Sequence, residues 1–111
     1  MIPTKQKLLE KVESYIDEHI SEQIPVKRIC DEFYISRTQL YELVGKELKG
    51  GIASFVKNKR LSVAKKLLKK TDMSLQDISV AVGFSDYNYF IRSFREAYNI
   101  TPNKYRKGKA S

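Results

Sequence analysis

The sequence holds few side chains that could do covalent chemistry. It has one cysteine, Cys30, and one histidine, His19, which are too few for a Cys/His zinc cluster or an intrachain disulfide. Cys30 is predicted to be a small core residue on an apolar face, and His19 a surface residue compatible with a nearby helix end. No Ser/His/Asp set, phosphate-binding glycine loop or paired carboxylate cluster is visible. We therefore expect neither an enzyme nor a protein with a metal or cofactor.

The most informative chemical property of the sequence is its charge. The sequence has 21 Lys and Arg against 13 Asp and Glu, a formal net charge of +8 at pH 7. Residues 1–50 hold 8 basic and 9 acidic side chains, whereas residues 51–111 hold 13 and 4, so the excess lies in the second half. This balance favours a polyanionic partner, either nucleic acid or an anionic membrane surface, although ribosome-associated and merely soluble basic proteins share it.

A membrane is the less favoured of the two partners. A membrane-surface helix gathers basic and large apolar residues on one short segment, whereas here the basic residues spread over several segments. No run approaches the roughly 20 apolar residues that cross a bilayer, and residues 1–5 lack a signal-peptide pattern. We therefore expect a cytoplasmic protein without membrane contact.

The spacing of apolar residues predicts an all-α fold of about seven helices in 111 residues. The expected helices cover about 4–19, 25–33, 36–48, 52–70, 74–82 and 86–98, with a short last helix from 101. The first is capped by Thr4 and buries a stripe of Leu8, Val12, Ile16 and Ile20, with Leu9 and Tyr15 beside it. Pro25 is expected at the first position of the second helix, a Ser36–Gln39 capping box opens the third, and Ser85 caps the sixth. The helix over 52–70 has a basic outer face, which could be only a solvated lysine surface: Lys57, Lys59, Arg60, Lys65, Lys66, Lys69 and Lys70.

Two helical hairpins repeat along the chain. An offset of 49 superposes Ile29-Cys30-x-x-Phe33-Tyr34-Ile35-Ser36 on Ile78-Ser79-x-x-Val82-Gly83-Phe84-Ser85, and after one extra residue an offset of 50 superposes Leu40, Val44 and Lys49 on Phe90, Phe94 and Asn99. A small residue where the helices cross, and a turn position at positive φ, are marks of a helix-turn-helix. Gly83 meets the second need. Tyr34 does not, so we expect its turn to be wider or less strained.

The organisation is therefore two helix-turn-helix subdomains, 1–50 and 71–111, joined by a long linker helix over 51–70. The second helix of such a hairpin enters a DNA major groove. A connector of about 18 residues is about 27 Å long, which suits two reading helices about 34 Å apart. One monomer could then read two successive major-groove segments.

Residues 4–107 resemble the DNA-binding domain of AraC/XylS-type bacterial transcription regulators. The resemblance is carried by Ile78-Ser79-x-x-Val82-Gly83-Phe84-Ser85-Asp86-x-x-Tyr89-Phe90-x-Arg92-x-Phe94, by Thr101-Pro102-x-x-Tyr105-Arg106 and by Arg60-Leu61-x-x-Ala64-x-x-Leu67-Leu68. It implies a two-motif domain that binds double-stranded promoter DNA and commonly activates transcription through RNA polymerase. The sequence departs from the family pattern at Tyr34, Lys49 and Asn99, where Gly is common; Asn tolerates the left-handed conformation.

The resemblance also implies which residues meet DNA. Base edges would be read by Arg37, Thr38, Tyr41 and Glu42 in the third helix and by Tyr87, Asn88, Ile91 and Arg92 in the sixth. Apart from the resemblance, we expect phosphates to be held by the N-cap hydroxyls of Ser36 and Ser85 and by basic side chains: Arg37, Arg95, Lys104 and Arg106. Each candidate reader could equally make only phosphate or water contacts.

A second function remains open at this point. The acidic first half would also suit a helical protein-interaction module, for example toward RNA polymerase, with only non-specific affinity for DNA. The isolated domain is expected to be a monomer, because one chain holds both reading helices. Met1 is expected to begin either a stand-alone regulator or the C-terminal part of a longer one.

Overall fold

The computed structural model describes residues 4–45 and 51–108, and these ranges contain seven helices and no strand. The helices are α1 (Lys5–Glu18), α2 (Val26–Phe33), α3 (Arg37–Gly45), α4 (Gly51–Lys70), α5 (Leu75–Ala81), α6 (Tyr87–Tyr98) and α7 (Pro102–Lys107). The predicted all-α class of two helix-turn-helix hairpins and a long helix between them is confirmed. The predictions for Leu48, Lys49 and Gly50 lie outside the described residues.

The chain divides into two compact units, Met1–Lys59 and Arg60–Ser111, and the division falls inside α4. The first half of α4 adds Ile52, Phe55 and Val56 to the core of the first unit. The second half adds Leu61, Ala64 and Leu68 to the core of the second unit. Because most helical stability in proteins comes from packing of an apolar face, each half of α4 is held in place by the unit to which it belongs.

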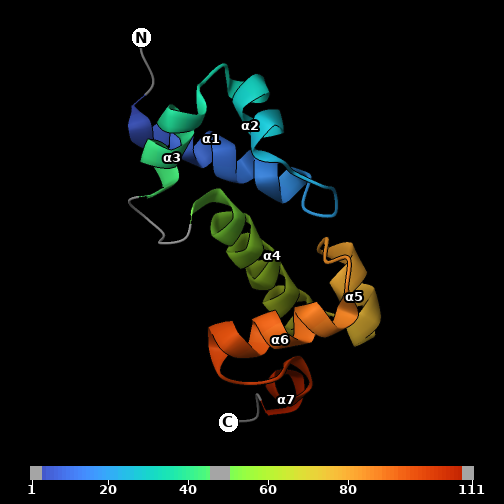
Figure 1. Ribbon diagram of the computed structural model, residues 1–111. Coiled ribbons are helices and arrows are strands. Elements are labelled where there is room, and N and C mark those ends of the chain that lie inside the picture. The colour runs from blue at the N-terminus through green and yellow to red at the C-terminus, as the bar shows by residue number, and fades with distance from the viewer. Residues whose placement is uncertain (1–3, 46–50, 109–111) are drawn as a thin grey trace. The chain divides into compact units, whose positions relative to one another are not determined.

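In the first unit, α2 and α3 pack with α1 around one apolar core (Figure 1). α1 begins as predicted at Thr4, whose hydroxyl accepts the Lys7 N–H at 3.1 Å. The buried stripe of α1 is Leu9, Val12 and Ile16. Leu8, predicted in that stripe, is only half-buried, so the helix is rotated toward Leu9.

The start of α2 corrects a second prediction. Pro25 is the N-cap and not the first helical residue, because its backbone is extended, with φ −68° and ψ 155°. The helix therefore begins at Val26. The core positions Ile29 and Cys30 are buried as the periodicity predicted.

In the second unit, α5, α6 and α7 gather around the second half of α4 (Figure 1). Its core is rich in aromatic side chains. The ring centroid of Phe90 lies 5.3 Å from that of Phe84 and 6.1 Å from that of Phe94. α6 ends at Asn99, which takes the left-handed conformation with φ 59°. Asparagine tolerates this conformation, so its replacement of glycine is accommodated as predicted.

Candidate nucleic-acid interface

The two hairpins turn through the same hydrogen bond. In the first, the Ile35 N–H donates to the carbonyl of Cys30 at 3.2 Å, and in the second the Phe84 N–H donates to the carbonyl of Ser79 at 3.0 Å. The donors and the acceptors are each 49 residues apart, which is the offset of the sequence repeat. Cys30 and Ser79 are both buried, as small residues must be where the two helices of a hairpin cross closely.

The turn residue of the first hairpin corrects the prediction for Tyr34. Tyr34 has φ 55° and ψ 43°, the left-handed conformation that Gly83 takes in the second hairpin with φ 94°. The first turn is therefore neither wider nor relaxed. Its side chain is 93% exposed, so no packing compensates the steric cost of this conformation.

The N-terminus of α3 is closed by the predicted capping box. The Gln39 N–H donates to the Ser36 hydroxyl at 3.0 Å, and the Ser36 N–H donates to Gln39 Oε1 at 2.8 Å. The Ser36 hydroxyl accepts in this pair, so its own proton is still available to a phosphate oxygen.

All four predicted base readers of α3 lie on its exposed side: Arg37, Thr38, Tyr41 and Glu42. Of these four, Tyr41 also packs against the start of α4. A Cβ added to Gly51 would lie 3.3 Å from a ring carbon of Tyr41, so the ring packs directly over this glycine. Gly51 has φ +79°, a conformation that also favours glycine. The start of α4 thus holds Tyr41 in place.

The N-terminus of α6 differs from the prediction. Its N-cap is Asp86, whose carboxylate accepts the N–H groups of Asn88 at 2.8 Å and Tyr89 at 3.3 Å. Ser85, predicted as the cap, is an exposed residue before it. Asp86 lies 50 residues after Ser36, so the extra residue of the second hairpin is Ser85 itself. The phosphate contact predicted for Ser85 stays a prediction, but its stated basis in capping was wrong.

The four predicted readers of α6 separate into two pairs. Asn88 and Arg92 are exposed, whereas Tyr87 and Ile91 are partly buried against the core of the second unit. Sequence reasoning missed Tyr89, whose ring lies 5.6 Å from the Arg92 guanidinium and 5.7 Å from the Phe84 ring. The spacing of three residues between Tyr89 and Arg92 was the available signal. Tyr89 thus connects the Arg92 head to the core.

The predicted phosphate-binding residues also differ in their surroundings. Arg95 and Lys104 are exposed. Arg106 instead donates to three main-chain carbonyls: Nε to Leu68 at 3.0 Å, Nη1 to Met73 at 2.8 Å and Nη2 to Thr71 at 3.1 Å. The structure therefore uses three of the five guanidinium donors of Arg106 inside the second unit.

The basic outer face predicted for α4 is less uniform than its sequence suggested. Arg60 is not on that face but half-buried, and its Nη1 donates to the carbonyl of Gly83 at 3.0 Å. Burial lowers the pKa of Arg60 below its ordinary value. Lys59 forms an ion pair with Asp17 at 3.3 Å. Arg60 thus stabilises the turn of the second hairpin by binding the Gly83 carbonyl.

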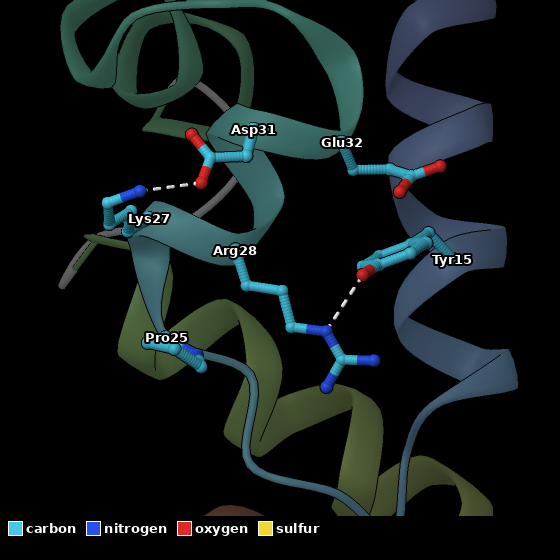
Figure 2. Close-up of a pocket in the computed structure, with 6 residues that line it drawn as sticks. All are labelled: Tyr15, Pro25, Lys27, Arg28, Asp31 and Glu32. Carbon is cyan, nitrogen blue, oxygen red and sulfur yellow. Dashed lines mark hydrogen bonds and ion pairs between the residues drawn. The ribbon is translucent and has the colours of Figure 1, made fainter.

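A pocket between α1 and α2 is lined by charged side chains that pair with one another (Figure 2). Arg28 donates to the Tyr15 hydroxyl at 2.8 Å and forms an ion pair with Glu22 at 2.8 Å, and Lys27 pairs with Asp31 at 2.7 Å. Hydrogen bonds from His19 and then Arg28 hold the pKa of Glu22 below its ordinary value. Because these cations are neutralised internally, this pocket is a poor site for a polyanion.

Two matching hairpins with exposed second helices define a double helix-turn-helix domain. A family model described as a helix-turn-helix domain matches residues 29–108. The chain is 35% identical over 102 residues to the uncharacterized HTH-type transcriptional regulator YijO of Escherichia coli K12, covering 92% of this chain and 36% of that protein. It is 30% identical to a solved AraC-type DNA-binding-domain transcriptional regulator from Chromobacterium violaceum, with a TM-score of 0.87 and coverage of 96% of this chain and 95% of the other. The DNA-binding domain of AdpA, solved with a target DNA, shares the fold at 24% identity and a TM-score of 0.78, over 90% of each chain.

The chain belongs to the AraC-type helix-turn-helix family, whose members are DNA-binding transcription regulators and not enzymes. It spans about a third of the length of the curated relatives that it matches. Within residues 4–45 and 51–108, no helix has the length and apolar character needed to span a membrane.

Proposed function

We propose that this chain regulates transcription by placing α3 and α6 in two successive major-groove segments of double-stranded promoter DNA. The observation that carries the proposal is the repeated turn, with one hydrogen bond at the same offset in both hairpins. This turn sets the angle at which a reading helix leaves its supporting helix. Two hairpins built alike present their second helices alike, which favours two reading sites.

The length of α4 supports the expected spacing. Its 20 residues correspond to about 30 Å at about 1.5 Å per residue. One turn of B-DNA advances about 34 Å between equivalent groove positions. A helix of this length, with side chains added, suits the distance between successive segments.

Within α6, Asn88 and Arg92 are the strongest candidates for base reading because both are exposed. A guanidinium pairs bidentately with guanine, and a carboxamide pairs in the same way with adenine. Tyr89 positions the Arg92 head from one side. Tyr87 and Ile91 contribute less to base reading, because part of each side chain is already buried. Each makes at most an apolar contact with a thymine methyl. In α3, Arg37, Thr38, Tyr41 and Glu42 have the exposure that base reading requires.

Selection of duplexes from a random pool, followed by footprinting, tests the function. Two protected major-groove segments about 10 bp apart are expected. Salt-sensitive binding without sequence selection would overturn the proposal in favour of a protein-interaction module with incidental DNA affinity. The mixed charge of the first unit is what favours that second function.

Arg92 and Arg95 provide a matched pair for testing the reading face, because both are exposed and they lie about one turn apart on α6. Arg92→Ala is expected to relax base preference at one position and to cost about 1–3 kcal/mol. Arg95→Ala should weaken binding to all DNA sequences equally. It should also reduce the salt slope, which is the slope of log K against log salt concentration, by about 1. A uniform loss for Arg92→Ala would show that Arg92 contacts phosphate only.

RNA polymerase is the partner that fits an activating regulator of this family. The monomeric state is supported by the presence of both hairpins in one chain. A cytoplasmic location and the lack of catalysis follow from the same role. Transcription from a selected promoter with purified polymerase tests activation, and repression or no effect would contradict it.

A further inference from the structure

A trough of about 340 Å³ lies in the second unit between α4, α6 and α7. Its lining combines four lysines, a serine and two tyrosines, with no carboxylate among the described residues: Ser62, Lys65, Lys66, Lys69, Lys70, Tyr98 and Tyr105. The α4 members recur at intervals of three and four residues, so they share one face of the helix. The opposite wall is aromatic.

Two of the lysines are held against that aromatic wall. The Lys65 ammonium lies 4.4 Å from the Tyr98 ring centroid and 5.6 Å from that of Tyr105. Lys69 lies 4.2 Å from the Tyr105 ring centroid and donates to the Tyr105 carbonyl at 2.7 Å. Contacts of this kind fix the ammonium groups at the trough, whereas lysines on a solvated face extend into water. Burial, followed by the neighbouring Tyr105, raises the pKa of Tyr98, so its hydroxyl stays a hydrogen-bond donor.

Like charges lie close together along this face of α4. Lys65 and Lys69 stand four residues apart, as do Lys66 and Lys70, and like charges at this spacing destabilise a helix. Over residues 60–108, no carboxylate lies within ion-pair distance of Lys65, Lys66 or Lys70. In the first unit, by contrast, Lys27 pairs with an acid at close range. A bound anion would relieve the repulsion.

We propose that this trough binds the sugar-phosphate backbone of the DNA that α6 reads, an inference that rests on the proposed function. Tyr98, which forms part of the trough, is the last residue of α6. The 12 residues of α6 extend about 18 Å, which exceeds the roughly 12 Å width of the major groove. The C-terminal end of a reading helix therefore leaves the groove where phosphates border it, as in homeodomains.

The test is the salt dependence of binding to the selected duplex. Lys65→Gln/Lys69→Gln is expected to lower the slope of log K against log salt by about 2, because each phosphate contact contributes about 0.9. Base preference should stay unchanged, since phosphate contacts carry no sequence information. The control is Lys7→Gln/Lys11→Gln on α1, two exposed lysines at the same spacing. It removes the same charge and should leave the slope unchanged.

A second double variant protects the test against misfolding. Lys66→Gln/Lys70→Gln alters exposed side chains of the same trough and should lower the slope by at least about 1 while circular dichroism stays unchanged. Slopes that fall no further than in the α1 control would overturn the proposal.

Two titrations distinguish the source of the anion. Inorganic phosphate or a polyglutamate peptide is added at low salt to the ¹⁵N-labelled chain, and amide shifts near Lys65 and Lys69 are followed. Saturable shifts together with an unchanged DNA slope would overturn the backbone assignment in favour of a free anion or an acidic protein. A wild-type chain that selects no sequence would instead refute the proposed function, so the two failures are distinguishable.

Discussion

Replacing Arg106 with methionine separates a structural role from a DNA-binding role. Arg106 on α7 donates to the carbonyls of Leu68, Thr71 and Met73. The first of these lies in the last turn of α4, where carbonyls have no partner within the helix, and the others lie in the connection to α5. Methionine keeps much of the apolar stem and removes every donor.

The expected loss follows from these three bonds. A hydrogen bond from a charged group contributes about 1.5–3 kcal/mol. The three bonds share one rigid group, so their contributions are not additive, and carbonyls near the surface regain water when the guanidinium leaves. We therefore expect Arg106→Met to destabilise the second unit by about 2–4 kcal/mol, which corresponds to a fall in Tm of at least about 8 °C for a unit of this size.

Hydrogen exchange measures how much stability Arg106→Met removes and also which helices lose it. Amides of α5, α6 and α7 should lose protection, while those of α1, α2 and α3 keep theirs. Lys107→Met is the control, because it removes the same charge from an exposed neighbour on α7. A loss below about 0.5 kcal/mol, the usual range for surface substitutions, combined with a salt slope reduced by about 1, would refute the structural role. Arg106 would then contact phosphate as the sequence predicted.

Four further substitutions test three local features. Tyr34→Gly should stabilise the first unit by about 0.5 kcal/mol in urea unfolding, because relief of the left-handed strain exceeds the added chain entropy; a loss of stability would contradict this. Asp86→Ala should cost about 1 kcal/mol as a lost N-cap, whereas Ser85→Ala should be nearly neutral, and the reverse order would restore Ser85 as the cap. Gly51→Ala should destabilise the first unit by about 1 kcal/mol and, by displacing Tyr41, reduce DNA affinity; unchanged affinity would remove Tyr41 from the interface.

Local signals in the sequence were sufficient for most of the fold. Side-chain caps need only the right residue at the right spacing, so Thr4 caps its helix as expected, and Ser74 and Thr101 cap theirs by the same kind of hydrogen bond. The hairpins were predictable because the small residue at the crossing, Cys30 or Ser79, recurs at one offset. The residue at positive φ four positions later was predictable for Gly83 but not for Tyr34, because a bulky residue ordinarily avoids that conformation.

The positions of two arginines could not be predicted, because a charged side chain is ordinarily assigned to solvent. Arg60 and Arg106 carry long apolar stems, and their guanidinium groups reach carbonyls 23 and more residues away in sequence. A periodicity argument has no access to such contacts. The prediction for the cap of α6 failed for another reason. Ser85 and Asp86 are adjacent and both can cap a helix, so the repeat alone did not show which of the two is the inserted residue.

The two units combine one hairpin geometry with different electrostatics. The first unit holds 10 basic and 9 acidic residues, several of them in ion pairs, whereas the second holds 11 and 4. Affinity from phosphate neutralisation depends on charges that the protein has not already neutralised. We therefore expect the second unit to supply most of the salt-dependent affinity. The first unit would add specificity through base contacts in α3, which release few counterions. In this division of roles, Glu42 on α3 is tolerable beside DNA, because the cations of the second unit retain the complex.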